Sequence, residues 1–209
     1  MNRRTSITLT DLSAVAIIAG EAIFYSRSPG SSAKAVSAVE DSQLARPDSP
    51  FFGSASAPVT VEEFFDRSCE ACRAFCPFVK QQIITASPQD VCVVLRSTTL
   101  HPATEEAVRI LEAARKQDQF QGVLKWLLQN QVQWVADGNP KPERAWELAQ
   151  EAGLDLARAR PDAVNPEVDS VLAQDVADVK VVGISGTPTF FINGKPSPAF
   201  GTQQLADLV

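Results

Sequence analysis

The chain has 209 residues, of which 44% are hydrophobic, and its 19 basic and 25 acidic residues give a formal net charge of −6. This length suits one folded domain with short appendages. An acidic chain lacks the basic surface that nucleic-acid binding requires, so we expect no nucleic-acid partner.

The first 25 residues have the layout of an export signal. Arg3 and Arg4 precede an apolar run over residues 12–25, which Glu21 interrupts. A basic start before a short apolar run is typical of a signal peptide, and this run is shorter than the ~20 residues of a membrane-spanning helix. We therefore predict a signal peptide or an N-terminal membrane anchor over residues 1–25. The remainder is then periplasmic or otherwise extracytoplasmic, soluble after cleavage or anchored through the apolar run.

Two further divisions follow from composition. Residues 26–50 are rich in Ser, Ala and Pro and show no sustained periodicity, which indicates a flexible linker. The folded domain is expected to cover residues 51–209.

A strand, a helix and a second strand open this domain. Residues 59–65 are β-branched, aromatic and acidic, as in a strand, and residues 91–95 form a continuous apolar run, as in a buried parallel strand. Between them, apolar residues recur at helical spacing at Cys72, Cys76, Val79 and Ile83. Pro77 lies inside that helix and is expected to kink it. This succession is a βαβ unit.

The middle of the chain is predicted to be helical, over about residues 102–183. The last of its helices begins with Asn165 as cap and Pro166 at the first position, and it ends at Gly183. Its apolar face is expected to bury Val168, Leu172, Val176 and Val179.

The C-terminal part returns to strands. Residues 189–192 are predicted as a strand, Asn193-Gly194 as a hairpin turn, and residues 202–209 as a short helix. The predicted fold class is therefore α/β, a βαβ–ββα domain with an all-helical insertion between its halves.

The segment Cys69-Glu70-Ala71-Cys72 carries the expected chemistry. Two thiols at this spacing are within disulfide reach, and the unpaired N–H groups at a helix start favour a thiolate there. Cys69 is the predicted nucleophile, and Cys72 would resolve the mixed disulfide. Half a zinc site and an inert structural bridge are the alternatives, but zinc needs four ligands and the chain has one histidine. We expect neither a metal nor a cofactor.

With these residues, the chain resembles the DsbA-like family of the thioredoxin superfamily. Glu63, six residues before Cys69, matches the buried acid of that family, and Pro77 matches its kinking proline. Thr187-Pro188 matches the cis-proline loop that lies against the disulfide. The resemblance implies a thioredoxin-like fold, proton transfer from Cys72 to Glu63, and a client chain that binds at Thr187 and Pro188.

One departure from the family concerns the central dipeptide. Glu70 and Ala71 stand where DsbA has Pro and His. The carboxylate opposes a thiolate at Cys69, so we predict a less oxidising couple. The direction of electron flow stays open.

The remaining candidates have less defined roles. Cys76 and Cys92 are interpreted as core residues, and a bridge between them is the alternative. His101 is not expected to take part in the chemistry. The tryptophans are expected in the core or lining a groove of the helical insertion, at Trp126, Trp134 and Trp146.

Together these features predict a thiol–disulfide oxidoreductase that acts on exported proteins through oxidation, reduction or isomerisation. Its partners would be clients with thiols or disulfides and a membrane redox partner that resets the pair. The alternative is a copper-binding metallochaperone similar to Sco-like proteins, because Cys72 and Cys76-Pro77 resemble their C-x-x-x-C-P motif and thiolates suit Cu(I).

Overall fold

The computed structural model describes residues 41–79, 89–136 and 139–197. The predicted signal or anchor, the first part of the predicted linker and the predicted helix at 202–209 lie outside these residues. No helix in the described ranges is long and apolar enough to cross a membrane.

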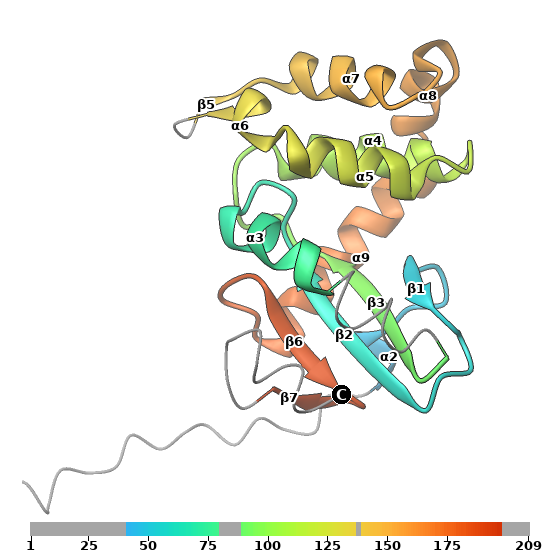
Figure 1. The fold of residues 1–209 in the computed structure, drawn as a ribbon, viewed down its shortest axis with the longest axis vertical. Coiled ribbons are helices and arrows are strands. Elements are labelled where there is room, and N and C mark those ends of the chain that lie inside the picture. Colours follow the sequence, from blue (N-terminus) through green and yellow to red (C-terminus); the bar gives the residue numbers. More distant parts are fainter. Residues whose placement is uncertain (1–40, 80–88, 137–138, 198–209) are drawn as a thin grey trace, which may run out of the picture. The chain divides into compact units, whose positions relative to one another are not determined.

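A five-stranded sheet forms the base of the domain, with strand order β1-β3-β2-β6-β7 (Figure 1). The central strands β2 (Val59–Phe65) and β3 (Val91–Ser97) run parallel, and β6 (Thr189–Ile192) pairs antiparallel with β2. β1 (Phe51–Gly53) and β7 (Lys195–Pro196) complete the two edges. The predicted parallel pair is confirmed, and β3 continues two residues beyond the predicted end.

Side chains of β2 alternate between two cores, as the pleat of a strand requires. Phe65 packs in the core under α3 (Glu70–Phe78), whereas Phe64 packs in a second core with α2 (Asp41–Leu44) and the helix α9. Glu63 thus shares a face with the cysteine helix, and Glu62 lies on the opposite face. Pro77 lies inside α3, as predicted.

The insertion between β3 and β6 is helical, which confirms its predicted place. Figure 1 shows α4, α5, α7 and α8 grouped beyond one end of the sheet, with α9 running back to it. Its helices are α4 (Thr104–Arg115), α5 (Phe120–Gln129), α6 (Gln131–Trp134), α7 (Pro142–Glu151), α8 (Leu156–Ala163) and α9 (Pro166–Val182). Two short strands, β4 (Val135–Ala136) and β5 (Asn139–Pro140), pair after α6, so the insertion is not all-helical, contrary to the prediction.

The boundaries of α9 confirm their local signals. The Asn165 side chain accepts a hydrogen bond from the Glu167 N–H, and Gly183 ends the helix in the left-handed region at φ 80°. Its buried face, however, differs from the expectation. Val176 is only half-buried, because Asp175 and Asp178 occupy the face that meets β3, where Arg96 pairs with both.

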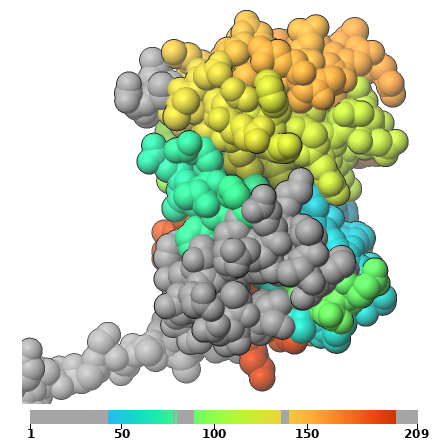
Figure 2. Space-filling model, in the orientation of Figure 1, coloured from blue at the N-terminus to red at the C-terminus, as the bar shows by residue number. Residues whose placement is uncertain are grey.

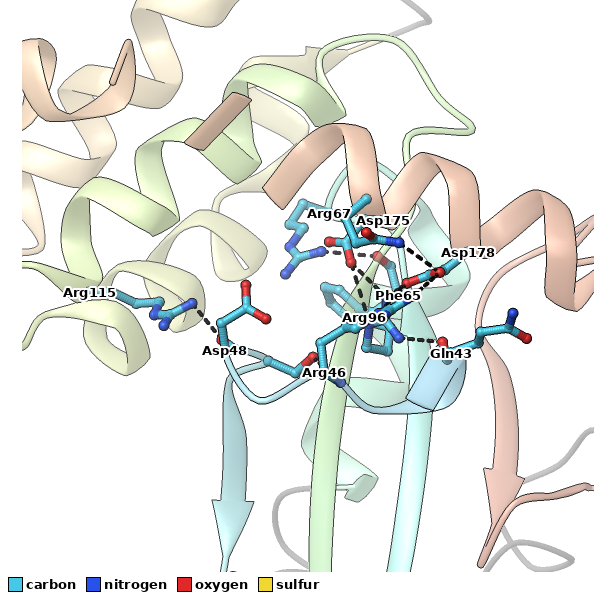
Figure 3. A network of polar contacts seen from close by, with 11 residues as sticks. Gln43, Arg46, Asp48, Phe65, Arg67, Arg96, Arg115, Asp175 and Asp178 are labelled. Carbon is cyan, nitrogen blue, oxygen red and sulfur yellow. Dashed lines mark hydrogen bonds and ion pairs between the residues drawn. The ribbon is translucent and has the colours of Figure 1, made fainter. Parts of the chain in front are cut away.

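The segment before β1 is a correction to the predicted linker. Leu44 is fully buried, the Arg46 guanidinium pairs with Asp178 at 2.6 Å, and Arg115 donates to the Asp48 carbonyl at 2.8 Å (Figure 3). Residues 41–50 therefore belong to the folded domain. The composition of this segment did not predict its folding, because the segment is held by the burial of Leu44 and by the ion pair between Arg46 and Asp178, which is distant in the chain.

Candidate functional site

Cys69 sits at the start of α3 and faces the loop before β6. It is the N-cap residue, with extended backbone at φ −77° and ψ 125°, and its side chain is largely buried. Its thiol Sγ lies 3.3 Å from the Thr187 carbonyl oxygen, to which it donates. The Thr187–Pro188 peptide bond is cis. The helix start and this loop, 118 residues apart in the chain, therefore meet at one sulfur.

Cys72 lies one turn deeper and is fully buried. The Asp66 backbone N–H donates to its Sγ at 3.5 Å. Burial raises the pKa of the Cys72 thiol well above its ordinary value, and the neighbouring Cys69 adds to this. Cys72 is therefore held as a thiol, so it needs a base before it can act as a nucleophile.

Glu63 supplies a carboxyl group on the same face of the sheet. Its side chain is 2% exposed, and burial raises its pKa to about 8, against the opposing charge of Arg67. Its Oε1 atom has no hydrogen-bond partner among the described residues, and it lines an apolar cavity with Phe65, Cys76 and Val79. The predicted burial of Glu63 is confirmed. A carboxyl with this pKa can hold or release a proton near neutral pH.

Asp66 holds the loop that presents the two cysteines, although sequence reasoning did not select it. It is fully buried, and its carboxylate accepts from the Ser68 N–H at 2.8 Å and from the Leu100 and His101 N–H groups at 3.0 Å. The Thr104 hydroxyl also donates to it. The bond to Ser68, two residues on, is a local Asx-type contact that could have indicated this role.

Gln131, from the helical insertion, fixes the same loop from the other side. Its buried amide Nε2 donates to the Arg67 carbonyl at 2.8 Å and to the Cys69 carbonyl at 3.1 Å. Figure 2 shows α3, in blue-green, against the yellow surface of the insertion. The insertion therefore fixes the backbone around Cys69 through Gln131.

We expect Asp66→Ala to lower the free energy of unfolding by about 3 kcal/mol or more, because several buried N–H and O–H donors lose their acceptor. Cys69 should then react faster with iodoacetamide, since its loop is released. Urea unfolding and timed alkylation measure the two effects. Asp90→Ala is the control, because the Asp90 side chain is exposed. Unchanged unfolding in Asp66→Ala would contradict this role.

The other predicted site residues surround this arrangement. Glu70 is exposed and Ala71 half-buried in the first turn of α3, while Pro188 is buried and Thr187 half-buried in the loop opposite. The structure therefore brings together all the residues that the sequence selected around Cys69 and Cys72.

Cys76 and Cys92 do not form the bridge considered as an alternative. All four cysteines are free, and burial raises the pKa of Cys92. Cys76 lies on α3 and packs against the core on the Phe65 face of the sheet. Cys92 is the register partner of Thr60, and both lie on the Glu62 face. The two thiols thus lie on opposite sides of the sheet.

The single histidine and the tryptophans form no hydrogen bond or ion pair with Cys69 or Cys72 among the described residues. His101 is exposed, and its Nδ1 lies 3.0 Å from Asp66 Oδ2. Trp134 and Trp146 are buried, and Trp126 is partly exposed. In the described parts of the chain, no cluster of three or more histidine, cysteine or acidic side chains could hold a metal ion.

Comparison with known proteins agrees with this geometry. A family model described as Thioredoxin matches residues 45–204. The chain belongs to the thioredoxin family. This membership confirms the predicted place in the thioredoxin superfamily and the predicted fold class.

Solved structures with the same fold support the class of a thioredoxin-like oxidoreductase. A thioredoxin-like oxidoreductase from Silicibacter pomeroyi is 31% identical, with a TM-score of 0.69, over 82% of this chain and 95% of that one. BdbD from Bacillus subtilis, in its oxidised form, is 22% identical, with a TM-score of 0.64, over 76% and 89% of the two chains. The latter likeness shows the fold alone.

Among curated proteins, the Na(+)/H(+) antiporter NhaA 3 of Salinispora tropica is 33% identical over 144 residues. These residues cover 68% of this thioredoxin-family chain but 21% of the antiporter. The chain thus spans about a fifth of the length of this curated relative.

Proposed function

We propose that this chain is a thiol–disulfide oxidoreductase that acts on exported proteins through Cys69 and Cys72. The observation that carries the proposal is the placement of Cys69 at a helix start, with its Sγ 3.3 Å from the Thr187 carbonyl. Cys72 is buried behind it, and Glu63 is buried on the same side of the sheet. These placements support Cys69 as the reactive thiol, Cys72 as the resolving thiol and Glu63 as the proton acceptor.

In the reducing direction, the Cys69 thiolate attacks one sulfur of a client disulfide. The client S–S bond breaks, a mixed disulfide forms, and the other client sulfur leaves as a thiolate that takes a proton. Cys72 then gives its proton to Glu63 and attacks the Cys69 sulfur. The client is released with both sulfurs reduced, and Cys69 and Cys72 end as a disulfide. The reverse sequence oxidises a client.

Thr187 and Pro188 are the proposed client-binding residues. The Thr187 carbonyl already accepts from the Cys69 thiol, so backbone placed beside this loop lies next to the reacting sulfur. An extended client segment can pair with a backbone edge in this way, because main-chain hydrogen bonds do not depend on client sequence.

The cellular setting of the reaction follows from the N-terminal residues. A basic start with a short apolar run favours an extracytoplasmic site of action, with anchoring through residues 12–25 or release after cleavage. A membrane redox partner would then reset the pair. Exposed Glu70 places a negative charge beside Cys69 and favours a couple less oxidising than that of DsbA.

The test is reduction of insulin by the full chain in the presence of dithiothreitol. We expect wild-type protein to accelerate precipitation of the insulin B chain and Cys69→Ser to show only the uncatalysed rate. Cys72→Ser should instead accumulate a mixed disulfide with the client, which mass spectrometry detects. Cys92→Ala is the matched control, because this thiol lies on the far face of the sheet. Full activity of Cys69→Ser would overturn the proposal.

A further inference from the structure

His101 is the single histidine of the chain, and the proposed reaction does not use it. It lies in the loop after β3, at the edge of the sheet where the loop of the cysteine pair also begins, because β2 and β3 are parallel and end together. The Thr98 N–H donates to the Phe65 carbonyl at 3.1 Å and so joins the two loops. A titratable ring is therefore placed beside the loop that presents Cys69.

The ring of His101 binds the buried carboxylate of Asp66. The His101 backbone N–H and the ring Nδ1 each lie 3.0 Å from Asp66 Oδ2. Each oxygen of this carboxyl accepts from a backbone N–H, which cannot take a proton in return, so Asp66 acts as an acceptor and Nδ1 carries the hydrogen. The His101 side chain is 43% exposed, so a second proton can bind at Nε2 without loss of this contact. Histidine is the side chain whose charge changes between pH 5 and 8.

Asp66 joins this ring to both cysteines through its own backbone. Its N–H donates to Cys72 Sγ at 3.5 Å, and its carbonyl accepts from the Cys69 N–H at 3.2 Å. Its carboxylate accepts from the Ser68 N–H at 2.8 Å, one residue before Cys69. Hydrogen bonds of one buried residue thus connect an exposed, titratable ring with the two thiols.

The other charged groups around this contact are bound elsewhere. Arg67 interacts electrostatically with Asp66, but its guanidinium donates to a backbone carbonyl instead. Glu105 and Glu106 begin α4, just after this loop; Glu105 binds an arginine of the same helix, and Glu106 accepts from a tryptophan of α7. Among the described residues, the carboxylate that binds His101 is therefore Asp66.

We propose that His101 is a positioning residue that acts through Asp66 on the cysteine pair, and that its protonated ring favours the reduced, thiolate form. Protonation turns the contact with Asp66 into a hydrogen bond between opposite charges, which is stronger and holds the loop more tightly. The charge of the ring also offsets that of Asp66, which otherwise opposes a thiolate at Cys69, three residues along the loop. This role rests on the proposed function, although the charge of the ring can be measured without any client.

The test follows the ring nitrogens of His101 by ¹H–¹⁵N NMR in the full chain as pH changes, once with the cysteine pair reduced and once with it oxidised. Because coupling between two sites is reciprocal, the midpoint should be higher in the reduced protein by about 0.3 unit or more, which is about a two-fold change in proton affinity. The neutral ring should carry its hydrogen on Nδ1. Equal midpoints in the two redox states, or a neutral ring with its hydrogen on Nε2, would overturn this role.

His101→Asn separates the charge from the hydrogen bond, because the amide nitrogen can take the place of Nδ1 but does not titrate. Relative to this variant, the glutathione equilibrium of the wild-type pair should move about two-fold toward the dithiol between pH 8 and pH 5. Lys141→Gln is the control, since it removes an exposed positive charge from the helical insertion, and it should follow the wild type. The same pH dependence in wild type and His101→Asn would contradict the role. The expected difference in a protein that does not reduce insulin would support the role of His101 and refute the proposed function.

Discussion

Glu63→Gln is expected to stabilise the reduced protein relative to the wild type as pH rises. The free energy of unfolding of the variant minus that of the wild type should be about 4 kcal/mol larger at pH 9 than at pH 5. Burial raises the pKa of Glu63 from 4.5 to about 8. The folded wild type therefore keeps a proton that the unfolded chain loses, and its stability falls as pH rises between these values. At about 1.36 kcal/mol per unit, the shift accounts for this difference. Glutamine is neutral throughout, so the variant lacks this dependence.

Urea unfolding of both reduced proteins at pH 5 and pH 9 measures the effect. Glu70→Gln is the control and should follow the wild type, because that carboxylate is exposed. Parallel pH dependence of wild type and Glu63→Gln would show that the Glu63 carboxyl is not held neutral by burial.

The same substitution should slow insulin reduction. In the proposed mechanism Cys72 then lacks its proton acceptor, and a positioned base typically contributes about 10²-fold or more to rate. The mixed disulfide with Cys69 should therefore persist longer, as non-reducing mass spectrometry would show. If Glu63→Gln is more stable and less active, the buried carboxyl costs stability and is kept for the reaction.

Arg96→Met is expected to lower the free energy of unfolding by about 3–5 kcal/mol, because removal of one partner leaves buried charges uncompensated. Arg96 is 1% exposed and binds Asp175 at 2.9 Å and Asp178 at 2.6 Å (Figure 3). It also donates to the Gln43 carbonyl. One guanidinium thus joins β3, α9 and the segment before β1.

The control is Arg109→Met. The ion pairs of Arg109 with exposed Glu105 and Asp169 should contribute about 1 kcal/mol or less to the free energy of unfolding. Adding Asp175→Asn to Arg96→Met should recover part of the loss, because Asp175 loses its ion-pair partner with Arg96, whereas Asp178 keeps Arg46. Urea midpoints of the three variants test this order. Equal losses in Arg96→Met and Arg109→Met would contradict a buried network.

Local signals explain what could be predicted about the fold. Three local features were predicted because each depends on neighbouring residues: the cap at Asn165, the helix end at Gly183 and the turn at Asn193-Gly194. Both turn residues have positive φ, at 48° and 76°. Within the stretch predicted to be helical, no separate helix was predicted where α8 lies. Its cap at Asp155 is ordinary, but Pro161 and a largely polar sequence hide its periodicity.

The choice between Glu62 and Glu63 illustrates a limit of strand patterns. Both side chains are buried, although a strand of this composition suggests one exposed face. Because side chains alternate along a strand, Glu62 and Glu63 lie on opposite faces of the sheet. Only the packing of α3 decides that the Glu63 face is the one that meets Cys69 and Cys72. The spacing of Glu63 from Cys69, compared with the DsbA-like pattern, predicted its burial, which the structure confirms.

The sequence by itself determined the spacing of the cysteine pair, the helix that carries it and the two parallel strands on either side of that helix in the chain, because these follow from residues close together. Only the tertiary structure decided what surrounds the pair. Asp66 and Gln131 hold the loop through contacts that span up to 64 residues. Arg96 binds carboxylates that lie 79 and 82 residues away. A polar residue in a strand or loop has no local signature of such a partner, since burial and pairing arise only when distant elements pack.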